Sequence, residues 1–371
     1  MGPWQSQKFA DPLARYPGPT RSTYTPTLLA FYALFSDRPY SELRPAWWGV
    51  EWITLLLFAL IGLVALRRSP GAFLLNGSVI VAVATSHFWR LHVERGQYYV
   101  FLALLMLGDI MLLIKAKRWP FAGALFGVAS ALRPTLIIAA PLLFAAGARR
   151  AALVCVGSAF ITVGTTCALW GTEMWFDYFH NPQYWEKSFL KRGLFEKVLG
   201  PVTAKASLVF QGISFETGFL PSFTTNLTFI GLANQGLFPS EYASLTGKIF
   251  VLVTFFAGMG AAYFLNRGGY HLKICLLPVL LTLAIIDFGI PVRFSYNDLL
   301  LIPLCWLLAL NAAKGDRTAT IALVGFAFLS LPIVVYTEIS VLRPLFLVGT
   351  TTLCTAFYLF GPSPSTNRMA G

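Results

Sequence analysis

The chain has few charged residues for its length. Of its 371 residues, 12% are Asp, Glu, Lys or Arg, whereas a soluble domain carries about 25%. Hydrophobic residues make up 56% and come in long blocks. These blocks exclude a sizeable soluble domain, and their lack of apolar–polar alternation excludes membrane β-strands. We therefore expect an all-α protein, a polytopic transmembrane helical bundle that forms a single integral membrane domain over residues 1–371.

The sequence has little that would hold a metal or a cofactor. Its five cysteines lie in or beside apolar runs, without CxxC spacing and without histidine companions, which argues against a metal cluster and a disulfide framework. There is no Walker loop, dinucleotide fingerprint, HExxH or GxSxG motif. The sequence also has no DxD-type cluster in the segments that we assign below to the non-cytoplasmic side. We expect no metal and no cofactor.

The net charge of +12 does not indicate a nucleic-acid partner. The basic residues cluster in short loops between apolar runs, the distribution that the positive-inside rule gives to cytoplasmic loops. We therefore expect no nucleic acid as a partner and a multi-pass protein of the cell inner (plasma) membrane.

The apolar runs predict about 9–11 membrane segments. Residues 119–132 and 134–147 are each too short to cross alone at ~1.5 Å per residue, so we expect a broken helix pair that enters and returns. The expected segments are 46–66, 73–90, 97–114, 119–132, 134–147, 151–170, 245–265, 272–290, 298–313, 318–335 and 341–360.

Alternation of these segments places the short basic loops on the cytoplasmic side. The non-cytoplasmic side then receives an outer loop over 1–45 with a short interfacial helix, and a second outer loop over 171–244. A transmembrane module over 46–170 and C-terminal transmembrane helices over 245–371 complete the chain.

Polar residues interrupt the apolar runs on the non-cytoplasmic side. Arg133 lies within an apolar run and is followed at once by Pro134. A charge at the centre of a membrane helix costs about 2.5–3.5 kcal/mol on insertion scales, so such residues face a partner, a cavity or a ligand. Two further groups gather at span junctions: His87, Arg90, His92, Glu94, Arg95 and Gln97, and later Arg293, Tyr296, Asn297 and Asp298.

These residue types suit the transfer of a sugar from a lipid phosphate. The phosphate leaves without a proton at neutral pH, so the reaction needs one carboxylate base for the acceptor hydroxyl. It also needs cations that hold the departing phosphate. A second carboxylic acid, which glycoside hydrolysis requires, is not needed.

Four short motifs, in order, resemble glycosyltransferase family 87 of the GT-C superfamily, the polyprenol-phosphate-mannose-dependent α-mannosyltransferase type. They are Tyr24-Thr25-Pro26 before a short apolar run, Gly96-Gln97 opening a span, Gly123–Gly127 with Ala131-Leu132-Arg133-Pro134, and Ser295–Leu299 near the outer end of a late span.

The resemblance implies a membrane enzyme that moves a hexose, with mannose as the expected sugar, from a polyprenyl-phosphate carrier to a lipid or glycan acceptor on the non-cytoplasmic face, with inversion. The family carries its catalytic Asp in the first outer loop after an initial transmembrane helix. This carries over to Asp11 as the base. The first helix of the family is not found before Asp11, so either the N-terminus is translocated unaided or a preceding helix is missing from this sequence. Arg133, with Arg293 or Arg95, would bind the donor phosphate. The substrate cavity would include Gln97, Glu94, His87, Tyr296 and Asp298.

Other interpretations of these residues stay open. Asp11 is also explained as a solvated loop residue, Arg133 as half of a structural ion pair, and Gln97 as an interhelical hydrogen bond. His87 and His92 are better explained as satisfied helix-end residues than as ligands. A transporter or flippase of a lipid-linked sugar would use the same cavity and arginines without a base, and an inactive truncated family member would use none of them.

Overall fold

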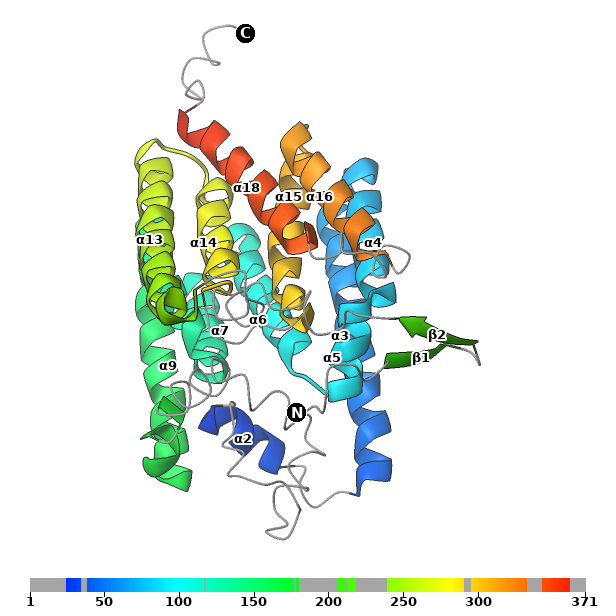
Figure 1. The fold of residues 1–371 in the computed structure, drawn as a ribbon. Helices are drawn as coiled ribbons and strands as arrows, with labels where there is room; N and C mark the ends of the chain where they lie inside the picture. The colour runs from blue at the N-terminus through cyan, green and yellow to red at the C-terminus, as the bar shows by residue number, and fades with distance from the viewer. Residues whose placement is uncertain are drawn as a thin grey trace, which may run out of the picture.

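A bundle of helices forms the protein in its computed structural model (Figure 1). The structure describes residues 25–34, 39–116, 118–176, 178–179, 206–210, 213–217, 239–289, 295–331 and 342–360. The helices of the first half are α2 (Pro26–Ala33), α3 (Tyr40–Leu66), α4 (Pro70–Thr85), α5 (His87–Arg95), α6 (Tyr99–Met111), η1 (Leu112–Ala116), α7 (Trp119–Leu132), η2 (Pro134–Ile138), α8 (Ala139–Ala145) and α9 (Arg149–Trp170). Those of the second half are α13 (Ser240–Arg267), α14 (Leu272–Ile286), η3 (Ser295–Leu301), α15 (Ile302–Ala312), α16 (Arg317–Ser330) and α18 (Leu342–Phe360).

The expected all-α polytopic membrane fold is confirmed. Among the described residues, the three helices α3, α9 and α13 are long and apolar enough to cross a membrane, and the other apolar helices are shorter. One small departure lies in the predicted outer loop 171–244, where strands β1 (Ala206–Phe210) and β2 (Ile213–Thr217) form an antiparallel hairpin. Ala206 pairs with Thr217, and Phe210 pairs with Ile213.

The expected broken helix pair is present and turns at Arg133. This residue has an extended backbone (φ −139°, ψ 95°) and separates α7 from the 3-10 helix η2. The residue before a proline is disfavoured in the α region, and Pro134 has no N–H to continue the helix. The Arg133-Pro134 dipeptide therefore ends α7 and starts the return through η2 and α8.

Two of the predicted spans end at a polar residue before their apolar runs do. The span expected over 73–90 stops at Thr85, because the Ser86 side chain accepts a hydrogen bond from Trp89 N (3.2 Å) and starts the separate helix α5. The span expected over 272–290 stops at Ile286, with Asp287 as its C-cap. In both cases the helix ends at a polar side chain, at a point where hydrophobicity alone predicted that it would continue.

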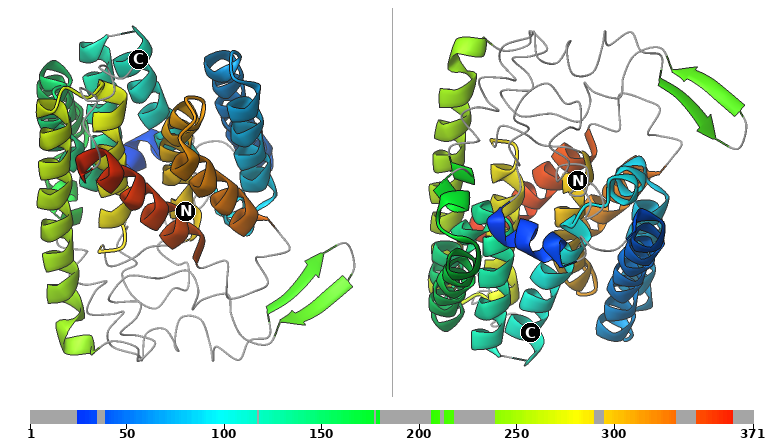
Figure 2. Two further views of the ribbon diagram at one scale, coloured as in Figure 1. Left: turned by 90° about the horizontal axis from the view of Figure 1, so that it is seen from above. Right: turned by 90° about the horizontal axis from the view of Figure 1, so that it is seen from below.

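The turns that join α3 to α4, α13 to α14 and α15 to α16 lie at one end of the bundle, at the top in Figure 1, and we call this end the basic face because these turns carry Arg67, Arg68, Arg267 and Lys314. Helix ends meet there: Asn266 Nδ2 donates to Ala145 O (3.3 Å), and the Tyr358 hydroxyl donates to Asp316 Oδ2 (2.9 Å). We call the opposite end, where α2 and α5 lie, the site face. Seen along the bundle from either end (Figure 2), α13 lies along one edge and α3 along the other.

Two glycines bring α7 unusually close to α9. A Cβ on Gly123 would lie 2.2 Å from Ala151 O, and one on Gly127 would lie 2.5 Å from Cys155 O. Ser158 Oγ also donates to Ala124 O (2.9 Å) across this contact. Small residues four apart let membrane helices approach closely. The glycine run thus fixes α7, and with it Arg133, against the long helix α9.

Candidate active site

Arg133 forms an ion pair with Asp287, which lies at the C-terminal end of α14. Arg133 Nη2 donates to Asp287 Oδ1, and the two side chains are 11% and 10% exposed. Asp287 follows the last turn of α14, where the helix dipole disfavours a negative charge. The arginine compensates this charge, and the pair joins the broken helix pair to the second half of the chain.

Three further side chains complete the surroundings of this pair. Asn297 Nδ2, from η3, donates to Asp287 Oδ2 (3.2 Å), and Arg133 Nε donates to Thr135 Oγ1 (3.3 Å). The guanidinium carbon of Arg133 lies 5.1 Å from the ring centroid of Tyr99, at the start of α6. An arginine over an aromatic face gains a cation–π attraction. Four separate elements therefore meet at one cationic group.

A tyrosine beyond the end of α9 belongs to the same environment. Burial raises the pKa of Tyr178, and the positive charge of nearby Arg133 acts in the opposite direction. Tyr178 is therefore a neutral hydroxyl at physiological pH and can donate or accept a hydrogen bond beside the arginine.

The N-terminal helix α2 is anchored beside Arg133. Thr25 caps α2 by accepting from Leu28 N (3.2 Å), and its hydroxyl donates to the carbonyl of Leu132 (3.2 Å), the residue before Arg133. Thr27 is hydrogen bonded to Thr166 of α9 (3.1 Å). The start of α2 therefore joins the bundle one residue away from the buried arginine.

A second buried polar cluster supports the start of α6. His92 Nδ1 lies 3.3 Å from Glu51 Oε1, which also accepts from Trp47 Nε1 (3.1 Å). His92 Nε2 accepts from Val100 N (3.2 Å), so the neutral ring carries its proton on Nδ1, facing Glu51. His92 also stacks on Trp89, with centroids 5.5 Å apart. This Glu51 cluster holds the α5–α6 turn. His92 accepts a hydrogen bond at Nε2, but its buried Nδ1 lies only within ion-pair distance of Glu51 and makes no hydrogen bond, so the interpretation of His92 as a satisfied helix-end residue stays a prediction.

The predicted site residues fall into three groups. Gln97 and Asp298 are buried at 2% and 1% exposure, and Arg133 is 9% exposed. Gln97 donates its backbone N–H to His92 O (3.1 Å) in the turn where Gly96 adopts a left-handed φ of 59°. His87, Glu94 and Arg95 lie in α5 and Tyr296 lies in η3, but their side chains are outside the described residues. Asp11 and Arg293 lie outside the described residues entirely.

The sequence reasoning missed Asp287, Tyr99 and Glu51. Asp287 was placed inside an expected span, although a carboxylate at the end of a strongly apolar run was a usable signal. Tyr99 follows Gly96-Gln97 in a span that looked uniformly apolar. Glu51 is the one acid in the expected span 46–66, and this is the pattern that marks a functional or paired residue in a membrane.

The arrangement is suited to an anionic group. The guanidinium has several N–H donors, and its contacts with Asp287 and Thr135 use Nη2 and Nε. Tyr99 and Tyr178 lie near it, and the amide of Asn297 contacts its partner Asp287. Over the residues that the structure describes, no group of three or more His, Cys, Asp and Glu side chains is placed to hold a metal ion.

Residues 23–194 match the model of glycosyltransferase family 87, a range that includes α2, the Glu51 cluster and Arg133. Neither the curated proteins nor the solved structures contain a match to the chain. This match over residues 23–194 agrees with the family predicted from the motifs, and together with the apolar helices it indicates a membrane glycosyltransferase.

Proposed function

We propose that this glycosyltransferase is of the GT-C type and transfers a hexose, with mannose as the expected sugar, from a polyprenyl-phosphate carrier to a lipid or glycan acceptor. The reaction would take place on the non-cytoplasmic side of the cell inner membrane, at the site face. Attack of the acceptor hydroxyl on the anomeric carbon would expel the lipid phosphate with inversion. The base would be Asp11, and Arg133, with Arg293 or Arg95, would bind the phosphate.

The observation that carries this proposal is the position of Arg133. It lies in the broken turn of α7 and η2, away from the basic face, with Tyr99 and Asp287 on two other helices. A phosphate is recognised by arginine through charge-assisted hydrogen bonds. In a low-dielectric site such donors also stabilise the charge that develops on a departing phosphate.

The anchoring of α2 supports Asp11 as the base. Asp11 precedes Thr25 by 14 residues in the sequence, and Thr25 is hydrogen bonded to the residue before Arg133. Asp11 would take the proton of the acceptor hydroxyl while the arginine holds the phosphate. Asp298, buried in η3, and Glu94 in α5 are the next carboxylates to test.

A flippase of a lipid-linked sugar is the second candidate. It would use the same arginine to bind the phosphate but would break no glycosidic bond. Asp11→Asn would then leave lipid movement intact, whereas it should abolish transfer by an enzyme.

The test is transfer of labelled mannose from a short polyprenyl-phosphate donor in membranes that contain this chain, with glucose and galactose donors beside it. Loss of transfer in Asp11→Asn, with an unchanged protein level, supports Asp11 as the base. Transfer that survives in Asp11→Asn moves the base to Asp298 or Glu94. If no sugar is transferred from any donor, but the donor moves across the membrane of vesicles that contain this chain, the protein is a flippase and not a transferase.

A further inference from the structure

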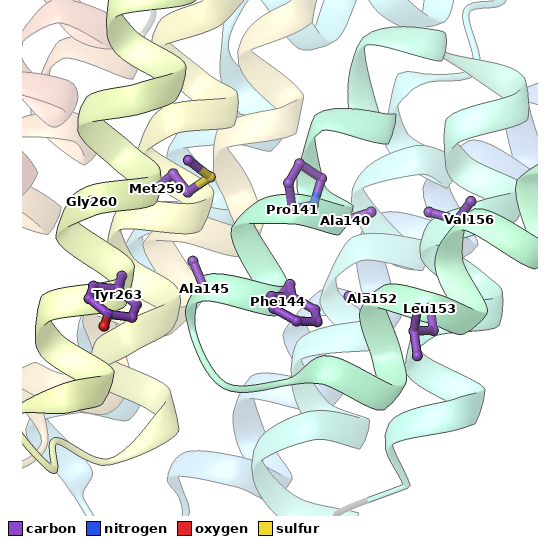
Figure 3. A pocket seen from close by; sticks show the side chains of 10 residues that line it. All are labelled: Ala140, Pro141, Phe144, Ala145, Ala152, Leu153, Val156, Met259, Gly260 and Tyr263. Atoms are coloured by element: carbon purple, nitrogen blue, oxygen red, sulfur yellow. The ribbon is translucent and has the colours of Figure 1, made fainter.

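A membrane-facing groove lies far from the site face, between α8, α9 and α13. It has a volume of about 570 Å³ and its lining is apolar. Phe144 from α8, Leu153 from α9 and Tyr263 from α13 point into or along it (Figure 3). These three side chains are 49%, 68% and 46% exposed. The groove therefore has the width and chemistry of a site for a hydrocarbon chain.

Cations gather at the end of the groove on the basic face. The guanidinium of Arg149 lies 5.4 Å from the ring centroid of Phe144, which lines the groove. Arg150 follows it, and Arg267 ends α13 next to Asn266, whose amide donates to Ala145 O. All three arginines are exposed, and none forms an ion pair with another described residue.

The start of α9 also favours a negative charge at this place. Its first residues are Arg149 and Arg150, its N-cap is Ala148, which makes no side-chain cap, and its first turn has no acidic residue. Helix N-termini attract anions through their unpaired N–H groups and their dipole, so two arginines there add to the positive potential. Asp316, which caps α16 on the same face, is already engaged by Tyr358.

We propose that this groove binds an anionic phospholipid from the leaflet on the basic side. One acyl chain would lie along Phe144, Leu153 and Met259, and the phosphate would be held by Arg149, Arg150 and Arg267. The hydroxyl of Tyr263, which points away from Met259 towards the basic face (Figure 3), would lie at the level of the glycerol backbone.

The occupant is distinct from the proposed sugar donor. Arg133 contacts side chains of α6 and α14, whereas the groove is formed on α8, α9 and α13 and has its cations at the opposite end of α8. A bound phospholipid would contact α8, α9 and α13 together. It would thereby stabilise α8 and α9, which pack against the broken turn that holds Arg133. This inference does not depend on the identity of the sugar or the acceptor.

The test compares the protein in nanodiscs of phosphatidylcholine with and without phosphatidylglycerol of the same chain length. Native mass spectrometry counts retained lipids, and the melting temperature reports stabilisation. We expect preferential retention of phosphatidylglycerol and a higher melting temperature. Each of Arg149→Gln, Arg150→Gln and Arg267→Gln should weaken retention about fivefold, the ratio given by ~1 kcal/mol per basic residue near a membrane surface. Arg67→Gln and Arg68→Gln, on the same face in the α3–α4 loop, are the controls.

Blocking the groove gives an independent variant. A side chain at Gly260, which lines the groove, would meet nothing within 4 Å at its Cβ, so Gly260→Phe should fill the groove without a clash. Gly164→Phe, at an equally open position on α9 away from the groove, is the matched control. We expect Gly260→Phe to lose the bound phospholipid and Gly164→Phe to keep it. Equal retention of the two lipids, unchanged retention in Gly260→Phe, or preferential retention of polyprenyl phosphate in this groove would overturn the proposal.

Discussion

Arg133 and Asp287 lie 154 residues apart in the sequence and form a buried ion pair at the ends of two short helices. The pair is the point at which the broken helix pair α7–α8 meets the second half of the chain. Removing both charges from water is expensive, and the attraction repays this cost only when the geometry and remaining hydrogen bonds are good. Asn297 and Thr135 supply such bonds here.

The ion pair gives a stability prediction that separates structure from function. Arg133→Met leaves Asp287 buried without its partner, so we expect the free energy of unfolding to fall by about 3–5 kcal/mol. Arg133→Met combined with Asp287→Asn removes both charges and keeps an amide for Asn297. The double variant should regain most of the loss.

The free energies of unfolding of the single and double variants are measured in mixed micelles with increasing SDS. Arg68→Met, at an exposed arginine in the α3–α4 loop, should change the free energy by less than about 0.5 kcal/mol. A double variant as unstable as the single one would show that the arginine contributes through contacts other than the ion pair.

The sequence allowed the fold class and the broken turn to be predicted, but not the partner of Arg133. Apolar run length sets the helices, and Arg133-Pro134 marks the break because proline restricts the residue before it. Asp287 is separated from Arg133 by 154 residues, and no local pattern encodes that contact. The Glu51–His92 contact was hidden for the same reason, since Glu51 lies in one apolar run and His92 in a polar group at a later span junction.

The approach of α7 to α9 predicts a steric effect at Gly127. Gly127→Ala would place Cβ 2.5 Å from Cys155 O and 2.6 Å from Ser158 Cβ. We expect a loss of about 1–3 kcal/mol of stability, the usual cost of overpacking. Gly157→Ala on α9, whose Cβ meets nothing within 4 Å, should be neutral or stabilising by up to ~1 kcal/mol. Equal melting temperatures for the two variants would mean that α7 and α9 pack less closely than described.

The Glu51 cluster predicts the effect of removing one imidazole. His92→Phe keeps an aromatic ring against Trp89 but removes the partner of Glu51 and the acceptor for Val100 N. Leaving buried polar groups unsatisfied should cost about 1–3 kcal/mol each. His271→Phe, at the exposed N-cap of α14, is the control and should leave the thermal melting curve in place. If the His92→Phe protein has the same melting temperature as the unaltered chain, the Glu51 cluster does not stabilise the fold.

The two faces predict opposite accessibility to a membrane-impermeant maleimide in intact cells. A cysteine at Thr172, exposed beyond α9 on the site face, should be labelled, whereas one at Arg68 on the basic face should be labelled only after lysis. The unaltered chain, with four of its cysteines buried, sets the background. Labelling of Arg68→Cys but not of Thr172→Cys in intact cells would show that the basic face is outside, which is opposite to the proposed orientation.

The most direct test of the central claim, that Arg133 binds the donor phosphate, is sugar transfer by the charge-free pair. The Arg133→Met/Asp287→Asn protein is compared with the unaltered chain and with Asp287→Asn alone, at matched amounts of folded protein and with a labelled polyprenyl-phosphate sugar. If the arginine stabilises the departing phosphate, the double variant should fold but transfer at least about 10²-fold more slowly, the usual cost of losing one such donor. Asp287→Asn alone should retain most of the transfer. Transfer at the unaltered rate by the folded double variant would contradict the claim and leave Arg133 a purely structural partner of Asp287.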